Sequence, residues 1–347
     1  MPRFLIVGQG LAGSVLALEL LSRGADITVM EAGLPGRATP VAAGMFNPMS
    51  FRRILPVWRA DEVMSAMERF YTAAETALGA RFFHRVPLVK LFPNADYAAL
   101  WQQRIDEGLP WISQASELPK GAVAPYGGGL VASAGYVDLP VFVGAVSSRL
   151  SADGRRVERM FNEDGVHLSS SGVTYVDLSD GFRFEGDGVI LATGTFARGS
   201  RRMAALPLQT NKGEVLTVST ADFASSVTLN NGKWLLPVGD GRFRLGASYL
   251  PGATDDLPTD AVCHQLLEKA VAMVDADFTV IEHRAGLRPT VTDHRALLGA
   301  VNNEPVYHFN GLGTRGVLNV PLLARWMADY LLNSQALPEE VGAGRFG

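Results

Sequence analysis

The hydrophobic pattern at the start of the chain predicts a strand, a helix and a second strand. Residues 3–8 (RFLIVG) form a short, nearly all-apolar run, as expected of a strand buried on both faces of a parallel sheet. Residues 10–23 carry apolar side chains at helical spacing, and Gly24 follows where a helix terminator belongs. Residues 25–31 (ADITVME) are again strand-like, which completes a βαβ unit.

The middle of the chain predicts a helix, a less regular stretch and a hairpin. Residues 58–78 show helical spacing, and the stretch from there through Gly135 mixes short strands with proline-punctuated turns. Residues 173–178 and 182–185 flank a Ser-Asp-Gly turn, which indicates a hairpin. Residues 189–192 then read as another buried strand.

A second architecture is indicated after residue 200. Strand candidates between Gly213 and Tyr249 are separated by the turn dipeptides at 231–232 and 240–241, both of the Asn-Gly or Asp-Gly type. We therefore predict an antiparallel meander, followed by a helix over residues 261–274.

The end of the chain repeats the logic of its start. An apolar run at 306–309 is followed by three glycines, Gly311, Gly313 and Gly316, and by a predicted helix over 315–332. This pattern predicts a second unit of strand, glycine turn and helix.

Together these patterns predict an α/β protein with two interleaved domains. We expect a discontinuous nucleotide-binding domain from residues 1–50, 136–200 and 281–347. A substrate domain, an antiparallel β-sheet plus helices, is then inserted in two pieces, residues 51–135 and 201–280.

The composition supplies enough apolar material for a large core. Of the 347 residues, 47% are hydrophobic and 19% are charged, which excludes a disordered chain. The formal net charge is −4. Because nucleic-acid binders usually carry a basic surplus, we expect no nucleic-acid partner.

Cysteine content, hydropathy and histidine spacing limit the compartment and the kinds of site that we expect. Cys263 is the single cysteine, which excludes an internal disulfide and any multi-cysteine metal site and suits a reducing compartment. No apolar run approaches the roughly 18 residues that span a bilayer. The six histidines are not paired at metal-ligand spacing. We therefore expect a cytoplasmic protein with no transmembrane segment and no metal site.

The first candidate for chemistry is the hexamer at residues 8–13. It matches G-x-G-x-x-G between a predicted strand and a predicted helix, with Gly8 for the tight turn, Gly10 for close approach of a pyrophosphate and Gly13 for helix–strand packing. Glu31 closes the second strand, where a carboxylate can bind ribose hydroxyls. The alternative is a glycine turn beside a surface glutamate.

The fingerprint by itself does not choose between NAD and FAD. A flavoenzyme that is reduced by NAD(P)H typically shows a second fingerprint in its interior, and this chain has none. If the dinucleotide is FAD, the electrons should therefore come from a bound organic substrate.

Further motifs occur in an order that resembles a known family. After the fingerprint come residues 42–45 (AAGM), 191–194 (LATG), 286–289 (GLRP) and the final glycine cluster. From Ile6 to Leu332 this order resembles the glycine oxidase and D-amino-acid oxidase superfamily of FAD-dependent amine oxidases. Residues 311–317 (GLGTRGV), with Pro321 one turn on, also resemble the flavin domain of the bifunctional enzymes that modify the tRNA wobble uridine. The resemblance implies an FAD-binding Rossmann-like domain of the glutathione-reductase type.

The resemblance also implies cofactor contacts. The ADP half of FAD would be held by the first glycine turn and the acidic strand end, namely Gly8, Gly10, Leu11, Ala12, Gly13, Glu31 and Ala32. Three further segments would lie along the pyrophosphate, the flavin ring, the adenine or the dinucleotide backbone: Ala43, Gly44 and Met45; Val157; and Thr193 and Gly194. The last glycine turn would bring a helix N-terminus to the flavin's pyrimidine edge through Gly311, Gly313, Thr314, Arg315, Gly316 and Val317. Because reduced flavin carries negative charge there, a helix N-terminus would stabilise it. A plain cap of the last helix is the alternative.

Two residues are candidates for the substrate. In this family the arginine of the G-x-R-P motif, here Arg288, binds the carboxylate of an amino acid. A guanidinium fork fits a carboxylate through two parallel hydrogen bonds. Tyr249 matches a position where relatives place a pocket residue. The alternatives are an arginine that bridges the two domains and an ordinary surface or core tyrosine.

The implied activity is oxidation of the C–N bond of an amino acid or secondary amine. Hydride transfer to flavin N5 would be followed by hydrolysis of the imine, with oxygen or a quinone as the electron acceptor. Cys263 falls in a predicted substrate-domain helix, so we expect non-covalent FAD. Two alternatives stay open: oxidation of a carboxymethylamino group on tRNA, which the acidic balance argues against, and a flavin-binding module without turnover.

Overall fold

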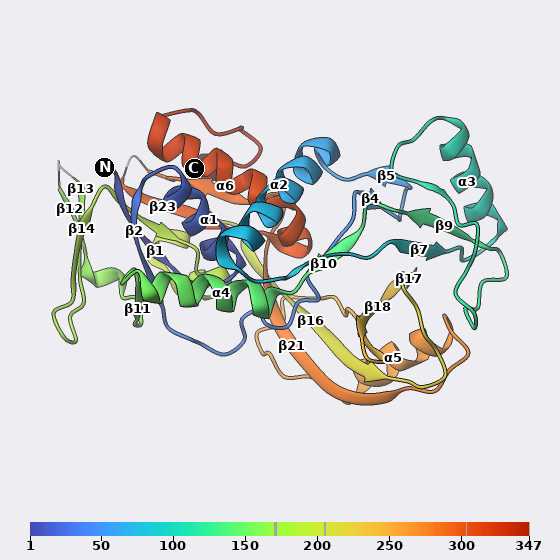
Figure 1. The fold of residues 1–347 in the computed structure, drawn as a ribbon. Coiled ribbons are helices and arrows are strands. Elements are labelled where there is room, and N and C mark those ends of the chain that lie inside the picture. The colour runs from blue at the N-terminus through green and yellow to red at the C-terminus, as the bar shows by residue number, and fades with distance from the viewer. Residues whose placement is uncertain (170–171, 205, 303, 347) are drawn as a thin grey trace.

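The computed structural model describes residues 1–169, 172–204, 206–302 and 304–346 (Figure 1). The chain forms two lobes. Two long strands, β16 (Leu208–Ser219) and β21 (Thr279–Val291), pair along their length and run from one lobe toward the other (Figure 1). The predicted domain boundary at residue 281 falls within β21, so one strand serves both predicted domains.

The first lobe is built on a sheet that, within the described residues, has six strands. In spatial order these are β11 (Arg156–Glu158), β2 (Asp26–Glu31), β1 (Arg3–Val7), β15 (Gly188–Leu191), β23 (Val306–Asn310) and β22 (Leu297–Gly299). The first five are parallel, and β22 joins antiparallel at the edge. Strands from the start, middle and end of the chain therefore lie side by side, which confirms the predicted α/β class.

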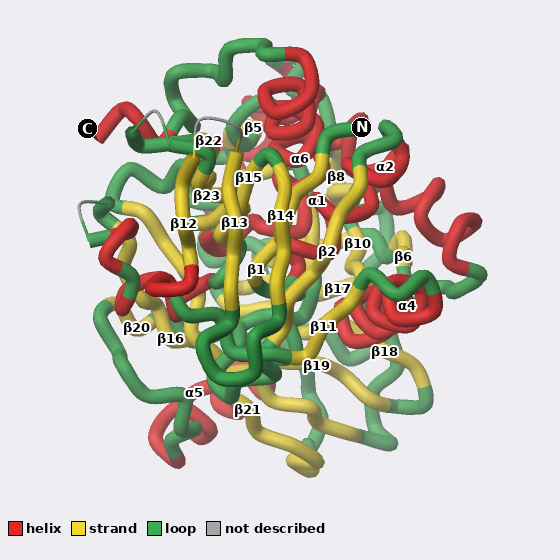
Figure 2. The backbone as a smooth tube through the Cα atoms, turned by 90° about the vertical axis from the view of Figure 1, so that its left-hand side faces the viewer, coloured by secondary structure: helices red, strands yellow, loops and turns green. Residues whose placement is uncertain are grey.

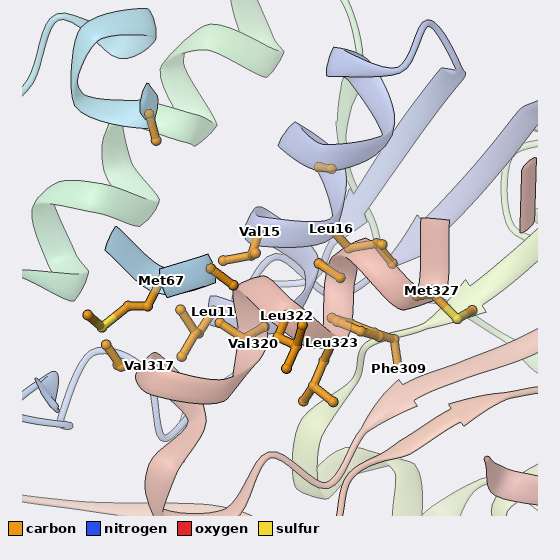
Figure 3. Close-up of a cluster of buried hydrophobic side chains, with 14 of the residues drawn as sticks. Leu11, Val15, Leu16, Met67, Phe309, Val317, Val320, Leu322, Leu323 and Met327 are labelled. Carbon is orange, nitrogen blue, oxygen red and sulfur yellow. The ribbon is translucent and has the colours of Figure 1, made fainter. Parts of the chain in front are cut away.

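Helices cover one face of this sheet. They are α1 (Leu11–Ser22), α4 (Leu139–Ala152) and α6 (Gly316–Asn333), with α2 (Ala60–Leu78) packed against α6. Figure 3 shows Val15 and Leu16 of α1 beside Leu322 and Leu323 of α6, with Phe309 of β23 near them. All five side chains are buried. Burial of this kind stabilises each by roughly 1.5–3 kcal/mol.

A small antiparallel sheet covers the opposite face (Figure 2). Its strands are β12 (Val166–Ser169), β13 (Gly172–Val176) and β14 (Arg183–Gly186). The predicted hairpin over 173–185 is confirmed, because β13 and β14 pair across the turn. Tyr175 and Phe184 are buried against Leu5 and Val189 of the parallel sheet.

The second lobe is built on a large mixed sheet. Along it lie β20 (Leu250–Pro251), β16, β19 (Arg242–Gly246), β18 (Lys233–Gly239), β17 (Thr228–Asn231), β7 (Leu88–Leu91), β9 (Gly128–Val131) and β8 (Ser113–Gln114). Both predicted turns, at 231–232 and 240–241, join paired strands.

The predicted antiparallel meander is confirmed for β17, β18 and β19, which pair in chain order, whereas β16 joins it out of chain order. β16 pairs with β19 rather than with β17, and it begins at Leu208, before the predicted Gly213. β17 instead pairs with β7 in parallel. That parallel pair joins the two predicted pieces of the substrate domain, because β7 lies in 51–135 and β17 in 201–280.

Two helices have no counterpart in the sequence prediction. α3 (Ala95–Asp106) was part of the stretch expected to be strands and turns. Its Trp101 is buried, and Tyr97 and Ile105 pack partly buried beside it, so the helix has an apolar face that the sequence prediction missed. Its start is marked by Asn94, whose side chain accepts the Tyr97 N–H at 2.8 Å. α4 begins after Asp138, which accepts from Val141 in the same way.

The remaining elements are short. Additional strands are β3 (Met45–Phe46), β4 (Met49–Ser50), β5 (Leu55–Pro56), β6 (Phe83–Arg85) and β10 (Gly135–Val137). α5 (Asp260–Val271) is the helix predicted over 261–274, and it ends three residues early. Short 3₁₀ turns cover 163–165, 194–199, 201–203, 313–315 and 343–346. In the described part of the chain, no helix has the length and apolarity to cross a bilayer.

Candidate functional site

A cavity of about 1000 Å³ lies between the parallel sheet and the strands β16 and β21. Its walls come from the carboxyl ends of β1, β2 and β15, from the first turns of α1 and α6, and from the 32–45 segment. Ligands of open α/β sheets bind at this edge, and this volume is at the top of the usual range of about 300–1,000 Å³.

The first glycine turn is a site of close backbone packing. A Cβ added to Gly8, whose φ is +100°, would lie 2.6 Å from the Ala192 carbonyl oxygen. A Cβ on Gly13 would lie 1.9 Å from the carbonyl oxygen of Gly8. Gly10 lines the cavity and is the N-cap of α1, with no side chain to bond the helix N–H groups. Gly8 and Gly13 therefore have the turn and helix–strand packing roles that the sequence predicts, and the approach of a pyrophosphate to Gly10 stays a prediction.

Glu31 ends β2 at the cavity wall and is only 7% exposed. Its Oε2 accepts the Gln9 N–H at 2.6 Å, and its Oε1 accepts the Gly33 N–H at 2.7 Å. Arg37 adds a longer contact of 3.3 Å to Oε1. A carboxylate has about four acceptor positions, so this one is held in place with acceptor capacity left toward the cavity.

The last glycine turn is organised by Asn310 at the end of β23. The Asn310 Nδ2 donates to the Gly194 carbonyl oxygen at 3.0 Å, and its Oδ1 accepts the Gly311 N–H at 2.8 Å. Gly311 and Gly313 have φ of +71° and +61°. One buried amide therefore ties together the two predicted motifs at 191–194 and 311–317.

Two helix N-termini face the cavity. The first turns of both α1 and α6 line it, and neither N-cap residue, Gly10 or Arg315, makes a side-chain capping bond. Thr39 accepts the Leu11 N–H at 3.1 Å. The helix dipole favours negative charge beside the first turn of each helix.

Arg288 lines the cavity from β21. Its Nη1 donates to Asn211 Oδ1 at 3.2 Å and to the Ser248 carbonyl oxygen at 3.3 Å. Within the described residues no carboxylate pairs with it, and burial lowers the pKa of Arg288 against an opposing effect of Tyr249. The site therefore holds a guanidinium whose charge no described acid neutralises.

Tyr249 and Trp234 lie on the same side of the cavity as Arg288. Tyr249 lines the cavity but is 53% exposed, which places it at the mouth. Trp234 lies over Gly246, where a Cβ would approach the indole to 3.0 Å. Trp234 also packs with Ala43 and Met45. It therefore connects the predicted substrate residues with the predicted flavin contacts at 43–45.

The structure brings most of the predicted residues to one cavity. Those that line it are Gly8, Gly10, Leu11, Ala12, Glu31, Ala32, Ala43, Gly44, Met45, Thr193, Gly194, Tyr249, Arg288, Gly313, Thr314, Gly316 and Val317. Four predicted residues are not part of the lining: Gly13, Val157, Gly311 and Arg315.

These four lie behind the wall. Gly13 and Gly311 are packed against neighbouring backbone or side chains. Val157 lies on the edge strand β11 and is paired with Met30 of β2. The segment just after β11, residues 159–164, lines the cavity instead. Arg315 donates to the Met49 carbonyl oxygen at 3.2 Å, and burial lowers its pKa.

Several lining residues were missed from the sequence. They include Arg37, Thr39, Asn310, Trp234 and the segment 159–164. The Asn310-Gly311 dipeptide is a turn signal that could have pointed to Asn310. Trp234 and segment 159–164 carry no motif, and only the packing of distant elements brings them here.

No group of three or more His, Cys, Asp or Glu side chains among the described residues is arranged to hold a metal ion. Cys263 lies on α5, outside the cavity lining, and burial raises its pKa.

Residues 3–330 match the model of a family described as FAD dependent oxidoreductase, DAO. The chain belongs to this family. This membership confirms the resemblance inferred from the motifs, and it agrees with the glycine turn, the acidic strand end and the large cavity.

Curated relatives lie at about one-quarter identity. A glycine oxidase of Pseudomonas aeruginosa is 26% identical over 95% of this chain and 94% of its own length. The tRNA 5-methylaminomethyl-2-thiouridine biosynthesis bifunctional protein MnmC of Idiomarina loihiensis is also 26% identical, over 94% of this chain but only 55% of its own length. This chain therefore spans about half of that bifunctional protein.

A solved structure supports the fold. The crystal structure of glycine oxidase from Geobacillus kaustophilus superposes with a TM-score of 0.79 at 22% identity, covering 97% of this chain and 96% of that one. At this identity the similarity shows a shared fold.

Proposed function

We propose that this FAD-dependent oxidoreductase oxidises the C–N bond of an amino acid or of a secondary amine that bears a carboxylate. The observation that carries the proposal is Arg288, a cation in the cavity wall that has only neutral hydrogen-bond partners among the described residues. A desolvated guanidinium without an acid partner is a strong site for a carboxylate.

The residues present fit FAD. The cavity is large enough for a dinucleotide, and the start of α1, where the N-cap Gly10 has no side chain, offers the positive end of the helix dipole to a pyrophosphate. Glu31 offers acceptor positions to ribose hydroxyls, and the start of α6 offers a second positive end to the flavin ring. We infer that FAD is bound without a covalent bond, because Cys263 lies outside the cavity lining.

Bound FAD would supply the two-electron acceptor. The protein's own contribution is orientation. Arg288 would hold the substrate carboxylate, and Trp234 and Tyr249 would enclose the rest of the molecule on the same side. This fixed orientation would hold the substrate C–H bond toward the flavin, where proximity contributes much of the rate. The substrate amine would enter neutral, so the reaction asks for no side-chain base.

The proposal is tested by mixing the purified yellow protein with a panel of amino acids and N-substituted amino acids without oxygen. We expect at least one carboxylate-bearing amine to bleach the flavin absorbance, and readmission of oxygen or a quinone to show which acceptor restores it. If no amine bleaches the flavin, the protein is a flavin-binding module without turnover.

Arg288→Lys gives a sharper test of the carboxylate site. The charge is kept, but the fork is lost, so kcat/KM for carboxylate substrates should fall by about 10–100-fold while FAD content stays at the wild-type level. Arg284→Lys is a control, because Arg284 is an exposed arginine on the same strand that pairs with Glu282. Unchanged kinetics in Arg288→Lys would contradict the assignment.

Oxidation of a carboxymethylamino group on tRNA is a second candidate. It is favoured by the 26% identity to MnmC, which equals the identity to the P. aeruginosa glycine oxidase. Gel shifts with unmodified and modified tRNA separate the two. We expect no shift, since the chain has a net charge of −4, and a tRNA that binds and bleaches the flavin would support this candidate instead.

A further inference from the structure

The strand β16 presents two different polar faces. Side chains alternate along a strand, and residues 210–214 are all buried. On one face Lys212 Nζ donates to Asp255 at 2.8 Å and Glu214 accepts the Thr259 N–H at 2.8 Å. This face holds the 253–259 segment. The other face carries Asn211, Gly213 and Val215, and Val215 lines the cavity.

Arg288 is built onto that second face. In the antiparallel ladder Asn211 lies directly opposite Arg288, and Gly213 opposite Gly286. A Cβ on Gly213 would lie 2.0 Å from Arg288 Nη2, so the missing side chain makes room for the guanidinium. The guanidinium therefore lies across β16 with Asn211 beside it.

Asn211 holds Arg288 without neutralising it. It is 1% exposed, and its Oδ1 accepts from Arg288 Nη1 at 3.2 Å. The second acceptor, the Ser248 carbonyl oxygen, is on a residue fixed by two bonds to Glu214, one from its N–H and one to its Oγ. Both acceptors engage Nη1, and both are uncharged.

We propose that Asn211 is a positioning residue that orients the Arg288 fork for a substrate carboxylate and that must be neutral to do so. The inference rests on the proposed function of Arg288. A carboxylate at position 211 would make the same hydrogen bond, but it would compete with the substrate for the positive charge. The absence of an acid partner among the described residues is thus a feature of the binding site.

The test compares Asn211→Asp with Asn211→Ala. Acetate is the probe for carboxylate binding, titrated into the FAD-loaded protein by calorimetry and by the visible flavin spectrum, and acetamide is the uncharged probe of the same size. We expect Asn211→Asp to weaken acetate by about tenfold or more and to raise the KM of a carboxylate substrate more than it changes kcat. Asn211→Ala should weaken acetate less, because it removes one hydrogen bond but leaves the charge. Acetamide binding should change little in both variants.

A purely structural role for Asn211 predicts the opposite order, because aspartate keeps the acceptor and alanine loses it. Acetate binding that is equal to wild type in Asn211→Asp, or weaker in Asn211→Ala than in Asn211→Asp, overturns the proposal. Thr290→Val is the matched control: Thr290 is buried in the same ladder, donates to the Gln209 carbonyl oxygen at 3.1 Å and lies outside the cavity lining. It should leave acetate binding unchanged.

Failure of the proposed function would look different. If Arg288→Lys also leaves acetate binding unchanged, Arg288 is not the carboxylate site. If Arg288→Lys weakens acetate binding and Asn211→Asp does not, the result supports Arg288 as the carboxylate site and contradicts the positioning role of Asn211.

Discussion

The glycine turn after β1 and the glycine turn after β23 both lead to a helix at the cavity, but different contacts hold the two turns. Each follows an interior strand of the sheet, and each leads to a helix whose N-cap residue makes no side-chain capping bond and whose first turn lines the cavity. In the first turn the glycines are required by contact, since Cβ atoms at Gly8 and Gly13 would lie 2.6 and 1.9 Å from carbonyl oxygens. In the last turn Gly313 has no atom within 4 Å of an added Cβ, and its φ is +61°.

The difference shows that similar motifs can select glycine for different physical reasons. The first turn needs glycine because a strand, a turn and a helix approach within backbone contact. In the last turn Gly313 needs only a left-handed backbone conformation, and a Cβ on Gly311 would meet the Val291 side chain at 2.5 Å rather than backbone. Asn310 holds this turn by its hydrogen bonds to Gly194 and Gly311. Substitutions should therefore have unequal effects at the two turns.

The largest effect is expected for Gly13→Ala. The added methyl group would collide with the carbonyl oxygen of Gly8, so helix α1 must move away from β1. We expect the free energy of unfolding to fall by about 3 kcal/mol or more, together with loss of bound flavin. Urea unfolding and the flavin absorbance per mole of protein check this. Gly144→Ala is the control, because Gly144 is a helical glycine with open space around it and should tolerate alanine.

Gly10→Val should separate flavin binding from folding. Gly10 has φ of −80°, which valine can adopt, and its added side chain would meet Thr39 and project where the pyrophosphate is expected. We expect a folded protein whose circular dichroism matches wild type but which retains no FAD after gel filtration. A yellow Gly10→Val protein would contradict the fingerprint assignment.

Acid should act on the last turn through a buried histidine. β1 has only Arg3 as an ionisable residue, whereas β23 carries His308, whose burial, with a smaller effect of Arg202, lowers its pKa from 6.5 to about 4. Between these values the unfolded chain binds a proton that the native state does not, so stability falls as pH falls from 6.5 toward 4. At pH 5 the loss from this group is about 2 kcal/mol.

The measurement is urea unfolding at pH 7 and pH 5. His308→Leu should show a smaller loss between the two pH values than wild type. His264→Gln, a change at an exposed histidine on α5, should show the wild-type loss. Equal losses in all three proteins would show that His308 is not buried as a neutral group.

Gly313→Ala is expected to have the smallest effect. No clash arises, so the cost is that of a left-handed backbone in a residue with a side chain, about 1 kcal/mol. We expect a small drop in melting temperature and a modest rise in the FAD dissociation constant. A loss as large as that of Gly13→Ala would show that the two turns obey the same constraint.

Prediction from sequence succeeded where a residue's role is local. The strand–turn–helix at residues 3–23, the strand end at Glu31 and the turns at 231–232 and 240–241 all depend on near neighbours in the chain. It failed for α3, whose apolar face of Tyr97, Trp101 and Ile105 was not recognised as a helical pattern. It also failed for the partner of β17, because a parallel pairing with β7 leaves no trace in either segment alone.

The residues of the candidate site show the same difference between local and long-range roles. The glycines, Glu31 and Arg288 could be named from motifs, and most of them line one cavity. Segment 159–164, Trp234 and Asn211 could not, because each gains its role from an element distant in sequence.

The sequence by itself determined the sheet and turn signals, the dinucleotide fingerprint and the arginine of the G-x-R-P motif. Only the tertiary structure decided that this arginine lies opposite Asn211, over a glycine, with no acid partner among the described residues. The physical reason is the separation in sequence between the residues that interact. Backbone conformation and helical or strand periodicity arise from residues a few positions apart, whereas the charge and hydrogen-bond environment of a buried group depends on which strands pair and in which register.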